Sequence, residues 1–86
     1  MTDVIKGFRY IPVCALIRIG QRMHDGAEKH GAYDPLSVQE RLDKIFRHAH
    51  AVLEGKTDED HLAAIASNAM FAIRAEEEAK HTKDTQ

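Results

Sequence analysis

The sequence predicts an all-α protein in which three antiparallel helices form a helical bundle that is completed by dimerisation. Three segments show apolar residues at spacings of three and four, and glycine or proline separates them. No segment alternates between apolar and polar residues with period two, so we expect no strand. A chain of 86 residues buries only about 60–65% of the surface that its unfolded form exposes. We therefore expect self-association to supply part of the core.

The first helix is expected over residues 12–30. Pro12 has the fixed φ angle that suits a first helical position, and apolar residues at helical spacing follow it. Gly31 is a natural stop, because glycine tolerates the positive φ angle that often ends a helix. The preceding residues 1–10 are expected to be irregular, because Gly7 interrupts any regular pattern.

The second helix is expected over residues 37–54. Ser37 and Glu40 have the spacing of a capping box, in which each side chain accepts a hydrogen bond from the other residue's backbone amide. Gly55 is the expected stop.

The third helix is expected over residues 58–80. Thr57 can cap it, and the acidic first turn, Asp58-Glu59-Asp60, suits the positive end of the helix dipole. The remaining tail is expected to fray, which leaves one domain, residues 1–86, with an ordered core of about residues 10–80.

This third helix is apolar on most of its sides. A polar stripe follows helical spacing and contains Asp58, His61 and Asn68. An apolar face adjoins it, formed by Leu62, Ile65, Ala66, Ala69 and Ile73, and the opposite side carries Ala64, Phe71 and Ala75. A helix that is apolar on most sides is normally enclosed. In so short a chain, a second copy is the expected cover.

Composition excludes several classes of function. The net charge is -2 and there is no block of basic residues, so no nucleic-acid partner is expected. The longest apolar run, residues 11–17, is far too short to span a membrane. Cys14 is the single cysteine, which fits a reducing compartment. The expected location is cytoplasmic.

Several polar side chains border the apolar faces, and each has two interpretations. Asp25 and Glu28 form an acidic pair that suits either a metal ion or a solvated face. The histidines make no recognised zinc spacing. Asn68 needs hydrogen-bond partners, because a buried amide without them costs about 1–3 kcal/mol. A structural role and a ligand-binding role are both open for it.

The order of these residues resembles a known family. The segments are Gly26-Ala-Glu-Lys-His-Gly31, Arg47-His48, Gly55, Asp58-Glu-Asp-His61-Leu-Ala-Ala and Asn68-Ala. Together they are similar to the small phage and bacterial domain named as the N-terminal domain of dATP/dGTP diphosphohydrolases. The similarity covers about residues 10–77. His30 stands where that family usually has tyrosine, and Ser67 where tryptophan is common.

The resemblance implies an all-α domain related to the MazG-like nucleotide pyrophosphohydrolases, which act as oligomers with Mg²⁺ held by helix carboxylates. Carried onto this sequence, the metal ligands would be Asp25, Glu28 and Asp58. The catalytic residues would be Glu28, Asp58 and His61, and the nucleotide contacts would be Lys29, Arg47, His48 and Asn68.

The expected function is therefore nucleotide binding, with hydrolysis of a purine deoxynucleoside triphosphate to the monophosphate and pyrophosphate. The alternative is a non-catalytic helical interaction module, encoded by a phage. The thin supply of paired carboxylates supports this alternative.

Overall fold

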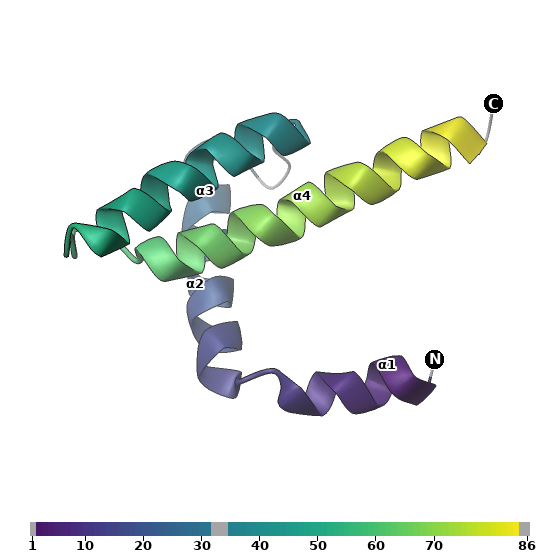
Figure 1. The fold of residues 1–86 in the computed structure, drawn as a ribbon, viewed down its shortest axis with the longest axis horizontal. Helices are drawn as coiled ribbons and strands as arrows, with labels where there is room; N and C mark the ends of the chain where they lie inside the picture. The colour runs from purple at the N-terminus through teal and green to yellow at the C-terminus, as the bar shows by residue number, and fades with distance from the viewer. Residues whose placement is uncertain (1, 32–34, 85–86) are drawn as a thin grey trace.

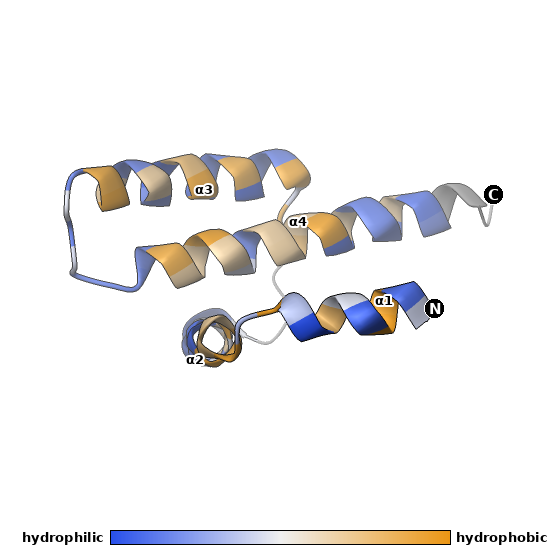
Figure 2. Cartoon of the chain, turned by 60° about the horizontal axis from the view of Figure 1, so that its bottom comes forward, coloured by the Kyte–Doolittle hydropathy of each residue, from blue (hydrophilic) through white to orange (hydrophobic). Residues whose placement is uncertain are grey.

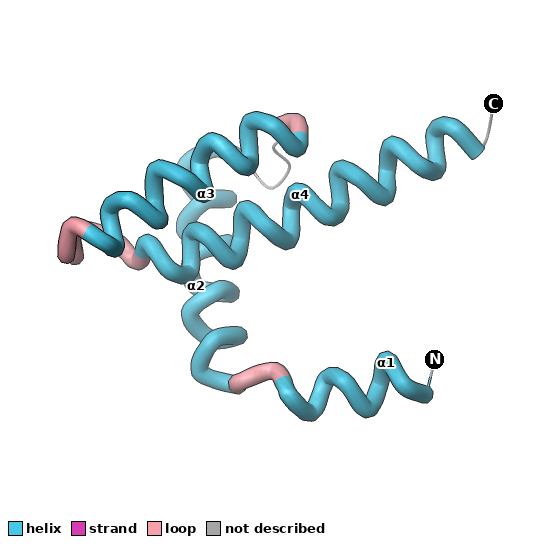
Figure 3. The backbone as a smooth tube through the Cα atoms, viewed as in Figure 1, coloured by secondary structure: helices cyan, strands magenta, loops and turns pink. Residues whose placement is uncertain are grey.

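A computed structural model of the chain describes residues 2–31 and 35–84, the last three without their side chains. The described residues form helices joined by short loops, with no strand among them (Figures 1 and 3). The elements are α1 (Thr2–Gly7), the 3₁₀ helix η1 (Phe8–Tyr10), α2 (Val13–His30), α3 (Val38–Leu53) and α4 (His61–Asp84). The all-α prediction is confirmed. The prediction of an irregular N-terminus is wrong, because α1 and η1 occupy it.

The helices α3 and α4 form an antiparallel hairpin, and α2 packs against α4 (Figure 1). Figure 2 looks almost along α2 while α3 and α4 lie across the view, so α2 crosses the hairpin steeply. The antiparallel relation therefore holds for α3 and α4 but not for α2. The helix α1 packs against none of the other α-helices in the described ranges.

The boundaries of α3 follow the sequence closely. Ser37 Oγ accepts from the Glu40 amide at 3.1 Å, and the Ser37 amide donates to Glu40 Oε1 at 3.2 Å. This is the predicted capping box. After the helix ends, Gly55 takes a φ of 77°, a conformation that few other residues adopt at low cost.

The start of α4 differs from the prediction. The helix begins at His61, because Asp60 rather than Thr57 caps it. Asp60 Oδ1 accepts from the Ala63 amide at 3.1 Å, and the Asp60 carbonyl accepts from the Ala64 amide. Aspartate is among the best residues at this position, since its carboxylate satisfies an amide that has no partner in the helix. The preceding carboxylates are thus released to contact other elements.

Two ion pairs hold α2 against the start of α4. Arg18 donates to Asp60 through two nitrogens, at 2.9 and 2.6 Å. One turn later Arg22 lies 2.6 Å from Glu59. The paired geometry of arginine and carboxylate fixes orientation as well as distance. The Arg18 hydrogen bonds lower the pKa of Asp60 from 3.8 to about 2.

The interior of the protomer is small and polar. Its buried apolar side chains are Ala51, Ala63 and Ala64, and its buried polar ones are Arg41, His61, Ser67 and Asn68. No large side chain among the described residues is fully buried. His61 and Asn68 of the polar stripe therefore face inward.

The expected apolar face of α4 is only partly covered: Ile65, Ala66 and Ala69 are half-buried, whereas Leu62 and Ile73 are exposed. Leu62 is 55% exposed and Ile73 is 61% exposed. Ala64, on the opposite side of α4, is completely buried. Within one protomer the α4 helix therefore packs by its Ala64 side and leaves its Leu62 side open.

The molecule is extended for its length. Its accessible surface is 6893 Å², whereas a compact monomer of this mass exposes about 5,100 Å². The radius of gyration is 14.7 Å, against about 12 Å for a compact chain of this length. No described helix is both long and apolar enough to cross a membrane.

The Arg18–Asp60 pair predicts how the fold responds to acid. The folded pKa of Asp60, about 2, lies below its ordinary value of 3.8. The pair therefore contributes stability that is complete above about pH 4 and is lost as the pH falls towards 2. We expect the melting temperature of Asp60→Asn, followed by circular dichroism, to fall less than that of the wild type between pH 4 and 2.

Part of the acid sensitivity should remain in this variant, because hydrogen bonds also lower the pKa values of Asp58 and Glu59. The control is Asp43→Asn, an exposed position on α3, which should keep the wild-type profile. If the melting temperatures of the wild type and Asp60→Asn fell in parallel with pH, the Arg18–Asp60 pair would not be the source of this acid sensitivity.

Candidate functional site

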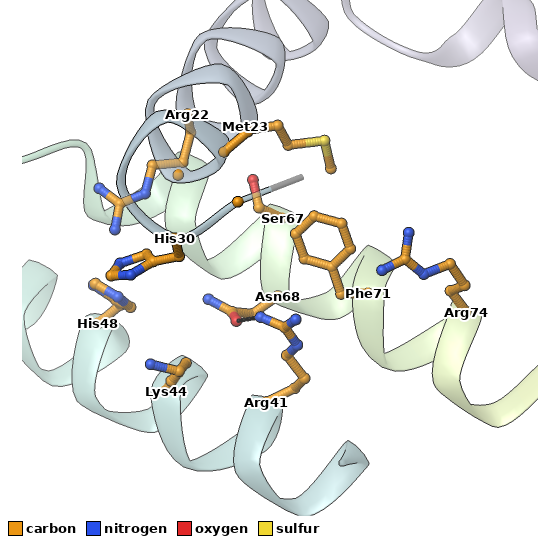
Figure 4. A pocket seen from close by; sticks show the side chains of 13 residues that line it. Arg22, Met23, His30, Arg41, Lys44, His48, Ser67, Asn68, Phe71 and Arg74 are labelled. Atoms are coloured by element: carbon orange, nitrogen blue, oxygen red, sulfur yellow. Dashed lines mark hydrogen bonds between the residues drawn. The ribbon is translucent and has the colours of Figure 1, made fainter. Parts of the chain in front are cut away.

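A cationic pocket of about 170 Å³ lies where α2, α3 and α4 meet (Figure 4). Arginine and lysine side chains reach it from all three helices, namely Arg22, Arg41, Lys44 and Arg74. His30 and His48 also line it. None of the described lining residues is an aspartate or a glutamate. A pocket with this charge favours an anionic ligand.

Helical spacing explains the contribution of α3. Arg41, Lys44 and His48 are separated by three and then four residues, so they share one face of the helix. That face is turned towards α4, and Arg41 is only 5% exposed. This part of the pocket can therefore be predicted from residue spacing in the sequence.

A polar network joins α3 to α4 at the pocket floor. Arg41 Nη1 donates to Asn68 Oδ1 at 3.1 Å, and Asn68 Nδ2 donates to the Ala64 carbonyl at 2.9 Å. The Arg41 guanidinium lies 4.7 Å from the centre of the Phe71 ring, and that of Arg74 lies 5.0 Å from it. Such contacts favour a cation over an aromatic face. Asn68 therefore has a structural hydrogen-bond role and also lines the pocket.

Ser67 adds a polar atom to the same pocket. The residue is 4% exposed, and its hydroxyl has no hydrogen-bond partner among the described residues. Figure 4 shows it on the pocket side of α4, next to Phe71. A buried hydroxyl without a partner costs about 1–3 kcal/mol. A ligand or a water molecule in the pocket would remove that cost.

Beside the pocket, two histidines meet between α3 and the start of α4. His48 Nδ1 and His61 Nδ1 are 2.9 Å apart, and His61 Nε2 donates to Asp58 Oδ1 at 2.8 Å. Ligand atoms of His48, His61 and Glu59 all lie within 4.8 Å of one another. Burial lowers the pKa of His48, with a smaller contribution from Arg22, while Glu59 opposes the shift. The neutral form of His48, which can ligate a metal ion, is favoured.

The nucleotide contacts implied by the resemblance separate into two groups. His48 and Asn68 line the pocket. Lys29 and Arg47 are exposed on α2 and α3 and are not among its lining residues. Arg47 directly precedes His48 on its helix, so its side chain is turned about 100° away from the face that carries His48.

The three expected metal ligands are dispersed in the protomer. Asp25 accepts from Gln21 Nε2 at 2.9 Å, and Glu28 lies 3.5 Å from His24. Asp58 lies in the loop between α3 and α4, where it contacts His61.

Magnesium requires several oxygen ligands around one position. In the described part of the chain, the expected carboxylates do not form a group close enough to hold one ion. Asp25, Glu28 and Asp58 of one protomer therefore do not converge on a single Mg²⁺. The expected catalytic residues are divided in the same way, because Asp58 and His61 are in contact, whereas Glu28 lies on α2 beside His24.

Sequence reasoning missed most of the cationic pocket. No sequence pattern predicts that Arg22 and Arg74 line the same pocket, because only the folded chain brings α2 and the middle of α4 together. The proximity of His48 and Glu59 was also unpredictable, since His48 lies within α3 and Glu59 in the loop that follows it. Ser67 was noted only as a departure from a family pattern.

Comparison with known proteins supports a family assignment. The family model described as dATP/dGTP diphosphohydrolase, N-terminal, matches residues 6–85. No curated protein and no solved structure matches the chain. The match covers nearly the whole sequence and confirms the resemblance seen in its motifs. The chain belongs to the dATP/dGTP diphosphohydrolase N-terminal family.

Proposed function

We propose that the protein binds a purine deoxynucleoside triphosphate through its phosphates, in the cationic pocket between α2, α3 and α4. The main support for this proposal is that four cationic side chains and no described carboxylate line the pocket. Charge-assisted hydrogen bonds from arginine and lysine are strong and suit phosphate oxygens. The preference for a purine deoxynucleotide comes from the family name alone.

The proposed reaction is hydrolysis to the monophosphate and pyrophosphate. Water attacks the α-phosphorus, the bond to the bridging oxygen breaks, and pyrophosphate leaves with the electron pair. Arg22 and Lys44 would stabilise the negative charge that develops on the leaving group, because preorganised cations act most strongly in a partly enclosed site. Magnesium would enter as the ion that accompanies the triphosphate, and Asp25, Glu28 and Asp58 would not bind it jointly within one protomer, because they do not form one group.

The second candidate is a non-catalytic interaction module. Its supporting observation is the dispersal of the expected carboxylates, since the described acidic side chains of one protomer form no three-carboxylate group. In this case the pocket would bind a nucleotide or another phosphate compound without turnover. The two candidates share the pocket and differ in chemistry.

A pair of variants on α3 tests the location of the phosphates. Lys44→Gln removes a half-buried cation that lines the pocket, whereas Arg47→Gln removes an exposed cation outside it. The loss of one charge-assisted hydrogen bond costs about 1.5–3 kcal/mol, so we expect Lys44→Gln to bind dATP and dGTP roughly tenfold to a hundredfold more weakly. Isothermal titration calorimetry measures this affinity.

The matched control is Lys56→Gln, an exposed lysine paired with Glu54 far from the pocket. It should bind nucleotide as the wild type does. A loss confined to Arg47→Gln would instead place the phosphates on the outer face of α3. Melting temperatures of all three variants distinguish a binding defect from unfolding.

Release of pyrophosphate decides between the two candidate functions. We expect wild-type protein with magnesium to convert dATP or dGTP to the monophosphate, and Lys44→Gln to do so more slowly. A coupled pyrophosphate assay over a panel of nucleotides measures the rate. Tight binding with no turnover of any nucleotide would favour the interaction module.

We also propose that the chain forms a homodimer or a larger oligomer through its exposed apolar face. The protomer exposes about 1,800 Å² more than a compact monomer of its mass. On the outer side of α4, Leu62 and Ile73 are more than half exposed, and the apolar residues of that face between them are half-buried. This excess per chain is larger than the roughly 800 Å² that each partner buries in an interface of standard size. A second copy is the occupant that completes the core.

Light scattering at micromolar concentration tests the proposal. We expect the wild type to have at least twice the mass of the chain and Ile73→Asp to shift towards the monomer, because a buried unpaired charge is costly. Gln39→Asp makes the same charge change on an exposed polar position of α3 and should leave the mass unchanged. A wild-type monomer would contradict the proposal.

A further inference from the structure

We propose that His48, His61 and Glu59 form a binding site for a transition-metal ion of the zinc class. None of its three ligands is a carboxylate that the family resemblance assigns to magnesium, although one of those carboxylates, Asp58, contacts His61. It does not rest on the proposed nucleotide chemistry. Its three ligands come from α3, from the first residue of α4 and from the loop between them.

The distances between the ligand atoms suit one ion. The two Nδ1 atoms are 2.9 Å apart, and the Glu59 carboxylate completes a group within 4.8 Å. With metal–nitrogen bonds of 2.0–2.1 Å in a tetrahedral site, two ligating nitrogens are separated by about 3.3 Å. The imidazole rings therefore need to move apart by only a few tenths of an ångström.

The contact between the two Nδ1 atoms also has a chemical meaning. One of them must carry a proton and the other a lone pair, because two lone pairs at this distance would repel each other. A metal ion can take the place of that shared proton and accept a lone pair from each ring. The arrangement of the rings is thus already close to that of two ligands around one centre.

Asp58 supplies the usual support for a metal-bound histidine. Its Oδ1 accepts from His61 Nε2 at 2.8 Å, which fixes the ring and leaves Nδ1 directed at the site. Ligating histidines almost always donate their other ring N–H in this way, and the acceptor strengthens the ligand. We assign Asp58 as a positioning residue for this metal.

The choice of ligands determines the class of ion. Two imidazoles and one carboxylate suit Zn²⁺, Co²⁺ or Ni²⁺, whereas Mg²⁺ and Ca²⁺ prefer oxygen ligands alone. Three protein ligands also leave a coordination position open, as in catalytic rather than structural zinc sites.

Solvent can reach the cluster from two sides. His48 lines the cationic pocket, while Glu59 and His61 line a second, more open pocket with Gly55 and Lys56. His61 itself is 7% exposed, so the site is enclosed but has an entry path for an ion.

Glu59 has two tasks in this proposal. It is paired with Arg22 at 2.6 Å through Oε1, and a carboxylate can hold the arginine with one oxygen and the metal with the other. This arrangement allows the ligand role of Glu59 to be separated from its ion pair by experiment.

The test uses the full chain without a histidine tag, freed of metal by a chelator and titrated with Co²⁺. We expect one equivalent per chain, with the visible absorption of a four- or five-coordinate ion. We expect Zn²⁺ to displace it and a large excess of Mg²⁺ not to do so. His48→Gln and Glu59→Gln should weaken binding at least tenfold, and Asp58→Asn about tenfold, as is typical when the partner of a ligating histidine is lost.

Two controls make the result specific. His50→Gln removes an exposed histidine of α3 that is paired with Glu54 at 3.1 Å, and it should retain the wild-type affinity. Arg22→Gln breaks the same ion pair as Glu59→Gln but keeps the carboxylate, so it should bind Co²⁺ at least as tightly as the wild type. Circular dichroism and melting temperatures, recorded without metal, verify that each variant is folded.

Several outcomes would overturn the proposal. These are the absence of Co²⁺ binding below millimolar concentration, an equal loss of affinity in His50→Gln, or wild-type affinity in both His48→Gln and Glu59→Gln. Equal losses in Arg22→Gln and Glu59→Gln would show that Glu59 acts through its ion pair and is not a ligand. Each readout is independent of nucleotide binding and turnover.

Discussion

Three consecutive carboxylates determine how this small protein is assembled. Asp58 accepts from His61, Glu59 pairs with Arg22, and Asp60 holds Arg18 while it caps α4. Because the loop bends at Asp58 and Glu59, the three neighbouring side chains reach different partners. One short loop thereby fixes the start of α4, the position of α2 and the orientation of a histidine. The cationic pocket exists because α2 is held at this point, with Arg22 at its edge.

Unlike an ordinary small domain, the chain buries polar side chains and exposes several large apolar ones. Arg41 and Asn68 occupy its interior, while Leu62 and Ile73 lie on its surface. A buried arginine with hydrogen-bond and aromatic partners specifies one arrangement of α3 against α4, although it contributes less stability than well-packed apolar side chains of the same volume. Leu62 and Ile73 of α4 are more than half exposed, and the proposed second copy would cover them. The cationic pocket is formed within one chain, and the proposed self-association would provide hydrophobic stabilisation between chains.

The helices were predictable because their signals are local. The capping box at Ser37 and the glycine stops placed α3 to within a residue, since caps act over a single turn. The start of α4 was misplaced because Thr57 and Asp60 are both plausible caps, and only the contact with Arg18 shows which one is used. The site was harder to predict. Spacing put Arg41, Lys44 and His48 on one face, but no local signal shows that Arg22 or Glu59 comes to the same place.

The two proposed sites are physically coupled through shared side chains. His48 belongs to both, and Arg22 lines the pocket while it neutralises Glu59. A divalent ion on Glu59 would draw the negative charge of that carboxylate towards itself and weaken its hold on Arg22. The guanidinium would then be more available to a phosphate in the pocket, and the ion would add a positive charge beside it. Coupling of this kind is reciprocal, because each ligand must raise the affinity for the other by the same factor. The Arg22–Glu59 pair holds α2 in place, and in the proposed scheme it also keeps Arg22 occupied until a metal ion binds Glu59.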